Sequence, residues 1–149
     1  MSKAFVNDDA TLPEPDGIPD RPETLPITAA GERTLRAALA VAAAQKDEAE
    51  LRRARVLTRI LETVYIPPPS PDHGQVVFGG QVEVEDQDGG VQRYRIVGPD
   101  EVHLQPLQIS VGSPFARALL GKQVGDEVTV RRPKGDLELT ILRLWPPEV

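Results

Sequence analysis

The hydrophobic positions of this 149-residue chain change their spacing near its middle, from a helical period to a period of two. Residues 28–65 consist largely of Ala, Leu, Glu, Arg and Gln, which favour helices, and contain no proline. Thr28 can cap a helix start, and the proline run that begins at Pro67 prevents a helix from continuing beyond Ile66. We therefore predict a helical region over residues 27–66.

Two hydrophobic stripes mark this helical region. Leu35 and Leu39 form the first stripe, and the second comprises Val56, Leu57, Ile60, Leu61 and Val64. Either one helix of about 38 residues, roughly 57 Å long, carries both stripes, or two short helices fold back as an antiparallel hairpin with its tip near residues 45–48. No Gly or Pro marks the turn, so both arrangements remain open. We favour the hairpin because it buries the stripes against each other.

Beyond the proline run, hydrophobic and polar residues alternate as in β-strands. Val82 and Val84 share one face of a strand, Gly89 and Gly90 indicate a hairpin turn, and residues 91–97 return. Further strands are predicted over residues 102–111, where Pro106 interrupts one or two strands, 127–133 and 137–145. The pattern predicts a small, mostly antiparallel sheet.

One short helix is expected within this sheet region. Ser113 can cap its start, Pro114 suits the first helical position, and Gly121 suits the end. Its predicted core face comprises Phe115, Ala118 and Leu119. The fold class is therefore α+β, with residues 27–66 helical, a Pro-rich linker over 67–74 and a β domain over 75–149.

Composition narrows the classes of function. Residues 1–26 hold five prolines and six acidic residues, which predicts a disordered acidic tail, either a solvated leader or an interaction arm. The chain has no Cys, no apolar run as long as a membrane span and no secretory signal, so we expect a cytoplasmic protein without disulfides. The net charge of −6 argues against broad nucleic-acid binding.

Candidate chemistry is sparse. His73 and His103 lie far apart in the sequence with no clustered acid, so no metal site and no Ser-His-Asp arrangement is predicted. We expect no catalytic residues, no stably bound cofactor and no membrane partner. A monomer is expected.

A long motif carries a family resemblance. The stretch from Ile109 to Gly135 reads ISVGSPFARALLGKQVGDEVTVRRPKG, and ITAAGERTLRAAL begins at Ile27. Together they resemble the bacterial Gre transcription elongation and cleavage factors. The resemblance implies an FK506-binding-protein-like C-terminal domain that docks on RNA polymerase at its secondary channel, with an N-terminal antiparallel coiled coil pointing down the channel.

The resemblance also implies site residues. The docking turn would comprise Gly112, Ser113, Pro114 and Phe115, although the family commonly has Asp or Asn where Gly112 stands. Family members hold a second Mg²⁺ in the polymerase active centre with paired acids at the hairpin tip. Here that motif is absent as such, and the candidates near the tip are Asp47, Glu48 and Glu50.

These acids have a simpler interpretation as helix N-terminal residues that the macrodipole stabilises, and each arm would be only about 26 Å long. We favour that interpretation because such a short arm would not reach the active centre. Recruitment of Mg²⁺ in the polymerase active centre is expected only if these acids take part in it.

A second group of charged residues lies on the later half of the helical region. Its members are Arg52, Arg53, Arg55 and Arg59. The simpler interpretation is a solvated face with pairs such as Glu48–Arg52. The alternative is an electropositive flank for an acidic partner, or for indirect contact with RNA or DNA.

The leading hypothesis is a regulator of transcription elongation that binds RNA polymerase without efficient transcript cleavage and is not itself an enzyme. One alternative is a genuine factor that stimulates Mg²⁺-dependent RNA hydrolysis by the polymerase. A second is a prolyl isomerase or chaperone-like module. The sequence leaves the sign of the regulation and the target genes open.

Overall fold

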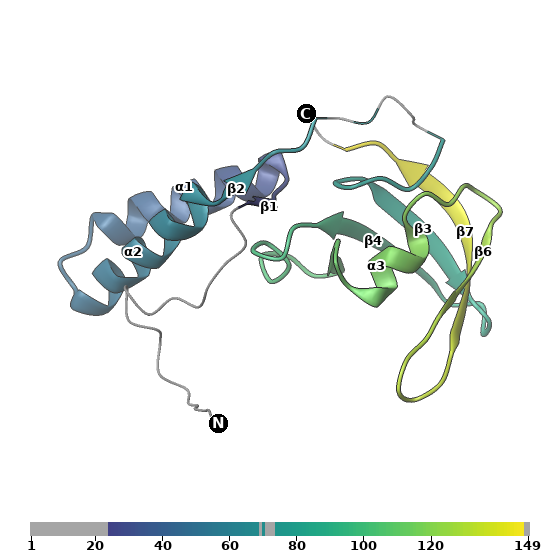
Figure 1. Ribbon diagram of the computed structural model, residues 1–149. Helices are drawn as coiled ribbons and strands as arrows, with labels where there is room; N and C mark the ends of the chain where they lie inside the picture. Colours follow the sequence, from purple (N-terminus) through teal and green to yellow (C-terminus); the bar gives the residue numbers. More distant parts are fainter. Residues whose placement is uncertain (1–23, 69, 71–73, 148–149) are drawn as a thin grey trace, which may run out of the picture.

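The computed structural model describes residues 24–68, 70 and 74–147. Within this part of the chain, a two-helix unit and a five-stranded sheet domain stand end to end (Figure 1). The mixed α+β prediction is confirmed. The predicted acidic tail up to residue 23, and half of the predicted linker, lie outside the described residues.

The helical region is a hairpin, so the alternative of one long helix is wrong. Helix α1 spans Ala29–Ala43 and α2 spans Glu48–Glu62, and the two pack along each other (Figure 1). Thr28 caps α1, because its hydroxyl accepts a hydrogen bond from the Gly31 amide at 3.0 Å. Asp47 caps α2, since its carboxylate accepts a hydrogen bond from the Ala49 amide at 3.2 Å. A cap of its own at each start explains why the chain turns without Gly or Pro.

Two short strands close the open end of the hairpin. Strand β1, Leu25–Pro26, pairs in parallel with β2, Val64–Tyr65. Two predicted boundaries are therefore wrong: the tail was expected to extend to residue 26, and the helical conformation to reach Ile66. Pairing with β2 orders the end of the predicted tail, and the Thr63 cap ends α2 before β2 begins.

The sheet domain has the strand order β5-β4-β3-β7-β6. Its strands are β3 Gln81–Asp86, β4 Val91–Val97, β5 Gln108–Ser110, β6 Glu127–Val130 and β7 Leu137–Trp145. All pairings are antiparallel except β4 with β5, which is parallel. The strand expected over 102–111 reduces to β5. The chain turns through Pro106 and a left-handed Leu107, with φ of 61°, before it can pair.

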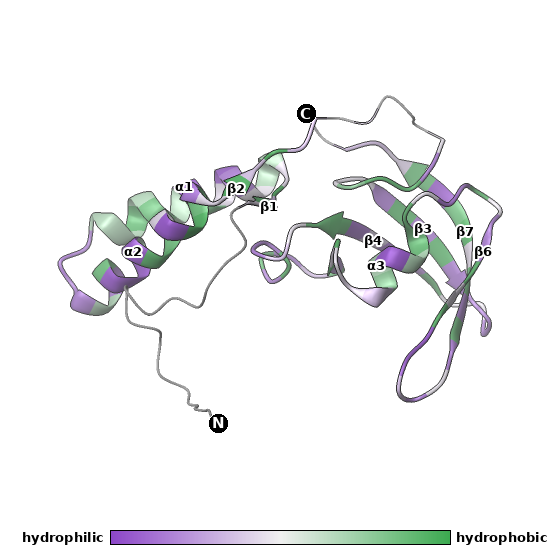
Figure 2. Cartoon of the chain, in the orientation of Figure 1, coloured by the Kyte–Doolittle hydropathy of each residue, from purple (hydrophilic) through white to green (hydrophobic). Residues whose placement is uncertain are grey.

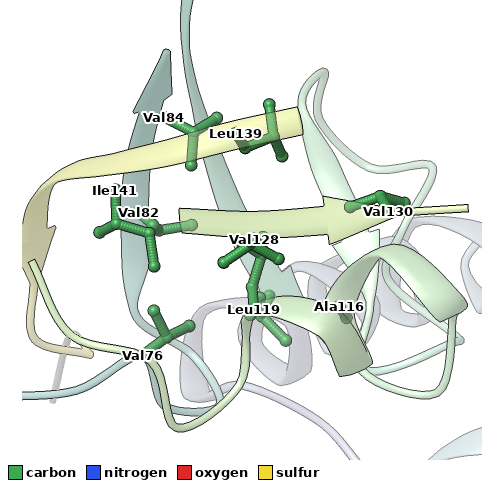
Figure 3. Close-up of a cluster of buried hydrophobic side chains, with 10 residues drawn as sticks. Val76, Val82, Val84, Ala116, Leu119, Val128, Val130, Leu139 and Ile141 are labelled. Atoms are coloured by element: carbon green, nitrogen blue, oxygen red, sulfur yellow. The ribbon is translucent and has the colours of Figure 1, made fainter. Parts of the chain in front are cut away.

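Helix α3, Pro114–Leu119, covers one face of this sheet. Leu119 extends from α3 toward Val128 of β6 (Figure 3). Leu119 is confirmed as a core residue, but Phe115 and Ala118 are only half-buried. Ala116, which the pattern did not select, is fully buried because the short helix turns this residue toward the core.

The hairpin and the sheet domain have separate hydrophobic cores. Ten buried residues form the core of the sheet domain, whereas the hairpin core contains only Ile27, Leu35 and Leu57 as buried members. Hydrophilic residues cover the loop between α1 and α2, and hydrophobic ones lie along the facing sides of the helices (Figure 2). The hairpin therefore depends more on its attachment to the sheet domain than the sheet domain depends on the hairpin.

Candidate functional site

The predicted docking turn is held rigidly between β5 and α3. The Ser113 hydroxyl donates to the Ser110 carbonyl at 2.7 Å and accepts from the Ala116 amide at 3.1 Å. The Ser113 amide also donates to the Ser110 carbonyl, at 2.9 Å. Both hydrogen-bonding functions of the hydroxyl are thus used within the turn, so Ser113 shapes the turn rather than offering a free hydroxyl to a partner.

The four predicted docking residues divide into two pairs. Gly112 and Pro114 are exposed, whereas Ser113 and Phe115 are half-buried. The Phe115 ring lies 4.9 Å from the Tyr94 ring, centroid to centroid, at an interplanar angle of 58°. Phe115 therefore supports the turn from within, and Gly112 and Pro114 form its outer surface.

Gly112 occupies an open position. A Cβ atom added there would meet no atom within 4 Å, and its backbone φ lies outside the left-handed region. No steric or backbone requirement for glycine therefore exists at this position. A larger side chain would project into solvent from the surface of the turn.

The three candidate acids gather at the start of α2, as predicted. Asp47 is the N-cap, and Glu48 and Glu50 lie in the first turn, where carboxylates stabilise the helix dipole. Glu50 also pairs with Arg53 at 3.7 Å. Within the described residues, no group of three His, Cys, Asp or Glu side chains is arranged to hold a metal ion. The three acids thus lie where carboxylates stabilise the start of a helix.

The four arginines of α2 are all exposed, but they differ in their surroundings. The predicted Glu48–Arg52 pair is not formed in the described structure; Glu50 and Arg53, at i,i+3 spacing, pair instead. Arg55 and Arg59 line a groove of about 410 Å³ between α1 and α2. Neither arginine has a carboxylate partner among the described residues.

The joint between hairpin and sheet domain centres on Glu101, which the sequence did not reveal. Glu101 is only 1% exposed and lies in the loop between β4 and β5. Its carboxylate accepts hydrogen bonds from the Thr28 amide at 2.7 Å, the Thr28 hydroxyl at 2.5 Å and the Gly98 amide at 2.8 Å. The carboxylate thus links the cap of α1 to the end of β4.

Two glycines permit this close contact. A Cβ atom on Gly31 would lie 1.9 Å from Glu101 Oε1, and one on Gly98 would lie 1.8 Å from the Pro26 carbonyl oxygen. From the same loop, Leu104 packs against the hydrophobic core of the hairpin. In the sequence, one signal for this close contact is Gly31, a glycine in the first turn of a segment whose other residues favour a helix.

The described residues include one of the two histidines. His103 is exposed, and His73 lies outside the described residues. None of the described helices has both the length and the apolar character needed to cross a membrane.

Comparisons with known proteins agree with the sequence resemblance. Residues 71–146 match the family model described as "Transcription elongation factor, GreA/GreB, C-term". The chain is 45% identical over 97 residues to Transcription elongation factor GreB of Pseudomonas aeruginosa, which covers 64% of this chain and 58% of that protein. The identity to the Haemophilus influenzae GreB is 44% over 95 residues, or 63% and 60% of the two chains. The matches thus span less than two thirds of these relatives.

Solved structures give more distant matches. Thermus aquaticus Gfh1 is 26% identical, with a TM-score of 0.45 over 83% of this chain and 99% of that one. The GreA/GreB factor from Nitrosomonas europaea is 21% identical, with a TM-score of 0.44 over 84% and 99%.

Proposed function

Because the chain belongs to the GreA/GreB family of transcription elongation factors, we propose that it binds RNA polymerase at the secondary channel and regulates elongation without efficiently stimulating transcript cleavage. The chain acts in the cytoplasm as a protein partner of the polymerase and carries no catalysis of its own. Its sheet domain is the FK506-binding-protein-like docking module of the family, and its hairpin is the counterpart of the family's coiled coil.

The observation that carries this proposal is the construction of the hairpin tip. Each arm has 15 helical residues, so the hairpin is about 22 Å long. Asp47 is engaged as the cap of α2, and Glu50 is paired with Arg53. Mg²⁺ binding needs carboxylates that converge on one point and stay free to coordinate. A short arm whose acids stabilise their own helix supports occupation of the channel without delivery of a metal ion.

Docking is assigned to the turn formed by Gly112 and Pro114. These two residues are exposed on a turn that Ser113 holds in one conformation. A rigid turn loses little conformational entropy when it binds, which favours its use as a contact surface. Gly112 lacks the side-chain acceptor that the family commonly offers at this position, so the affinity should be lower than that of relatives with Asp or Asn.

Glu101 would set the direction of the hairpin relative to the docked sheet domain. It is buried, and its hydrogen bonds join Thr28 of the hairpin to Gly98 of the sheet domain. With the sheet domain docked at the channel mouth, this joint would direct the hairpin into the channel. Contact of the exposed arginines with RNA or DNA in the elongation complex would be indirect.

The alternative is a genuine cleavage factor, which the identity of 45% to a GreB protein favours. In that case Asp47, Glu48 or Glu50 would leave the helix cap and recruit Mg²⁺ within the polymerase. Short arms argue against it, since the acids would stop short of the active centre.

Binding to purified core RNA polymerase tests the proposal. The variant Pro114→Lys places a charge on the exposed turn without removing a hydrogen bond of Ser113, and we expect it to lose binding. Thr129→Lys, at an exposed site on β6 at the opposite edge of the sheet from β5, is the matched control and should bind as the native chain does. Absence of binding by the native chain, or equal loss in both variants, would refute the docking assignment.

A further inference from the structure

The groove between α1 and α2 has a chemistry that the proposed docking does not use. Its lining is largely apolar and includes two arginines and one glutamate. The lining residues are Leu39, Ala43, Leu51, Ala54, Arg55, Thr58, Arg59 and Glu62. Leu39 and Leu51 are only half-buried, and Arg55 and Arg59 have no carboxylate partner within the described structure. An extended, acidic segment with occasional hydrophobic residues would complement both features.

The chain itself contains such a segment. Residues 8–23 hold six acidic residues and one basic residue, together with Leu12 and Ile18. Four prolines within the same stretch favour an extended conformation, which lowers the entropy lost on binding. We propose that residues 8–23 bind in the groove between α1 and α2, with their carboxylates on Arg55 and Arg59, and shield this basic surface from other acidic ligands.

The fold brings this segment to the correct end of the groove. The Leu25 amide donates to the Thr63 carbonyl at 2.9 Å, and β1 runs parallel to β2. Because the two strands are parallel, the chain at Thr24 lies beside the last turn of α2, where Glu62 ends the groove. From Glu62 to Leu51 the helix rises about 17 Å, whereas 16 extended residues span about 50 Å. The segment is therefore long enough to follow the whole groove.

Charge makes the binding dependent on salt. The two arginines are exposed, so their attraction to the carboxylates is screened over about 10 Å at 0.1 M salt and about 3 Å at 1 M. Anionic ligands that bind the two arginines more strongly would thus displace the segment from the groove. The free protein would present less positive surface than its α2 sequence suggests.

Paramagnetic relaxation in the full-length protein tests this proposal without RNA polymerase. The chain has no native Cys, so Thr11→Cys gives a single attachment site for a nitroxide label. We expect loss of amide signal intensity over residues 51–62 at low salt and its recovery at 1 M salt. The label on Thr129→Cys, in the sheet domain, is the matched control and should leave residues 51–62 unaffected.

Two further samples make the test decisive. The double variant Arg55→Gln/Arg59→Gln should abolish the signal loss, whereas Arg117→Gln/Arg131→Gln, which removes the same charge elsewhere, should not. The proposal is overturned if the Thr11 label leaves residues 51–62 unchanged at low salt. It is equally overturned if the loss spreads evenly over all basic surfaces, or if it arises between a labelled chain and a second, isotope-labelled copy.

Discussion

The sheet domain and the helical hairpin both bury a hydrophobic surface, but their hydrophobic cores differ greatly in size. The core cluster of the sheet domain has ten buried hydrophobic residues, whereas that of the hairpin has three, and the two helices bury only the small side chains of Ala42 and Ala54 in addition. The family model matches the sheet domain almost end to end, from residue 71 to 146, and does not extend over the hairpin. The part proposed to dock is thus the part with the larger hydrophobic core, and the part proposed to enter the channel is short and has a small core.

The joint explains how the weaker unit is held in place. Glu101 supplies a buried carboxylate to three donors, two of them on Thr28, which is also the cap of α1. A single side chain of the sheet domain therefore stabilises both the position of the hairpin and the start of its first helix. The comparison predicts that changes in the sheet domain affect both units, while changes at the tip remain local.

The largest expected effect comes from truncation in the sheet-domain core. Ile141→Ala should lower the free energy of unfolding by about 4 kcal/mol, and Leu57→Ala in the hairpin by about 2 kcal/mol, because the open sides of the hairpin let its core collapse. Trp145, the one tryptophan, lies in β7, so its fluorescence during urea unfolding reports the sheet domain. Far-ultraviolet circular dichroism reports mainly the helices. Equal losses in the two variants would contradict the comparison.

The next effect concerns the joint. Glu101→Ala leaves the Thr28 and Gly98 amides without an acceptor and should cost about 3 kcal/mol. We expect the helical transition to separate from the Trp145 transition and to move to lower urea. Glu101→Gln keeps one acceptor oxygen and should cost less, and the exposed Glu127→Ala should change stability by less than about 0.5 kcal/mol. Coincident transitions in Glu101→Ala would show that the two units do not depend on this joint.

A smaller effect is expected at the tip. Asp47→Ala should destabilise α2 by about 1 kcal/mol, while Asp47→Asn should be nearly neutral because Asn caps helices as well as Asp. Amide exchange in the first turn of α2 measures the difference. If Asp47 bound a metal ion, Asp47→Asn would impair function as much as Asp47→Ala, although only Asp47→Ala would destabilise α2.

A substitution of Gly112 should have the smallest effect on the free energy of unfolding. It should have a measurable effect on the affinity for RNA polymerase. Gly112→Asp meets no steric obstacle and should leave stability within about 0.5 kcal/mol. One additional hydrogen bond to RNA polymerase, worth about 1 kcal/mol, would raise the affinity about fivefold. Gly112→Ala, which adds bulk without an acceptor, serves as the control in the same titration. Identical affinities for the Ala and Asp variants would show that the missing side-chain acceptor does not lower the affinity for RNA polymerase.

The sequence was informative wherever local rules decide the structure. The caps Thr28 and Ser113, the Pro114 start of α3 and the alternation through Val82 and Val84 all lie where the pattern predicted. Each depends on neighbours within a few residues. The choice between a hairpin and one helix was also favoured correctly, because two separate hydrophobic stripes require two faces to meet.

Long-range contacts could not be read in the same way. Glu101 is 73 residues from Thr28 in the sequence, and nothing around it indicates a buried carboxylate. Strand β1 is two residues long and exists only because β2 lies beside it. Burial of Ala116 follows from how α3 sits on the sheet, which no helical periodicity over six residues could specify.

The central claim is that this chain occupies the polymerase channel without delivering the metal for cleavage. Backtracked elongation complexes mixed with the protein and Mg²⁺, followed by sizing of the RNA, test it most directly. We predict that the RNA keeps its length, and that the chain slows cleavage induced by a longer-armed family member. Rapid shortening of the RNA by the native chain, abolished in the triple variant Asp47→Asn/Glu48→Gln/Glu50→Gln, would contradict the account.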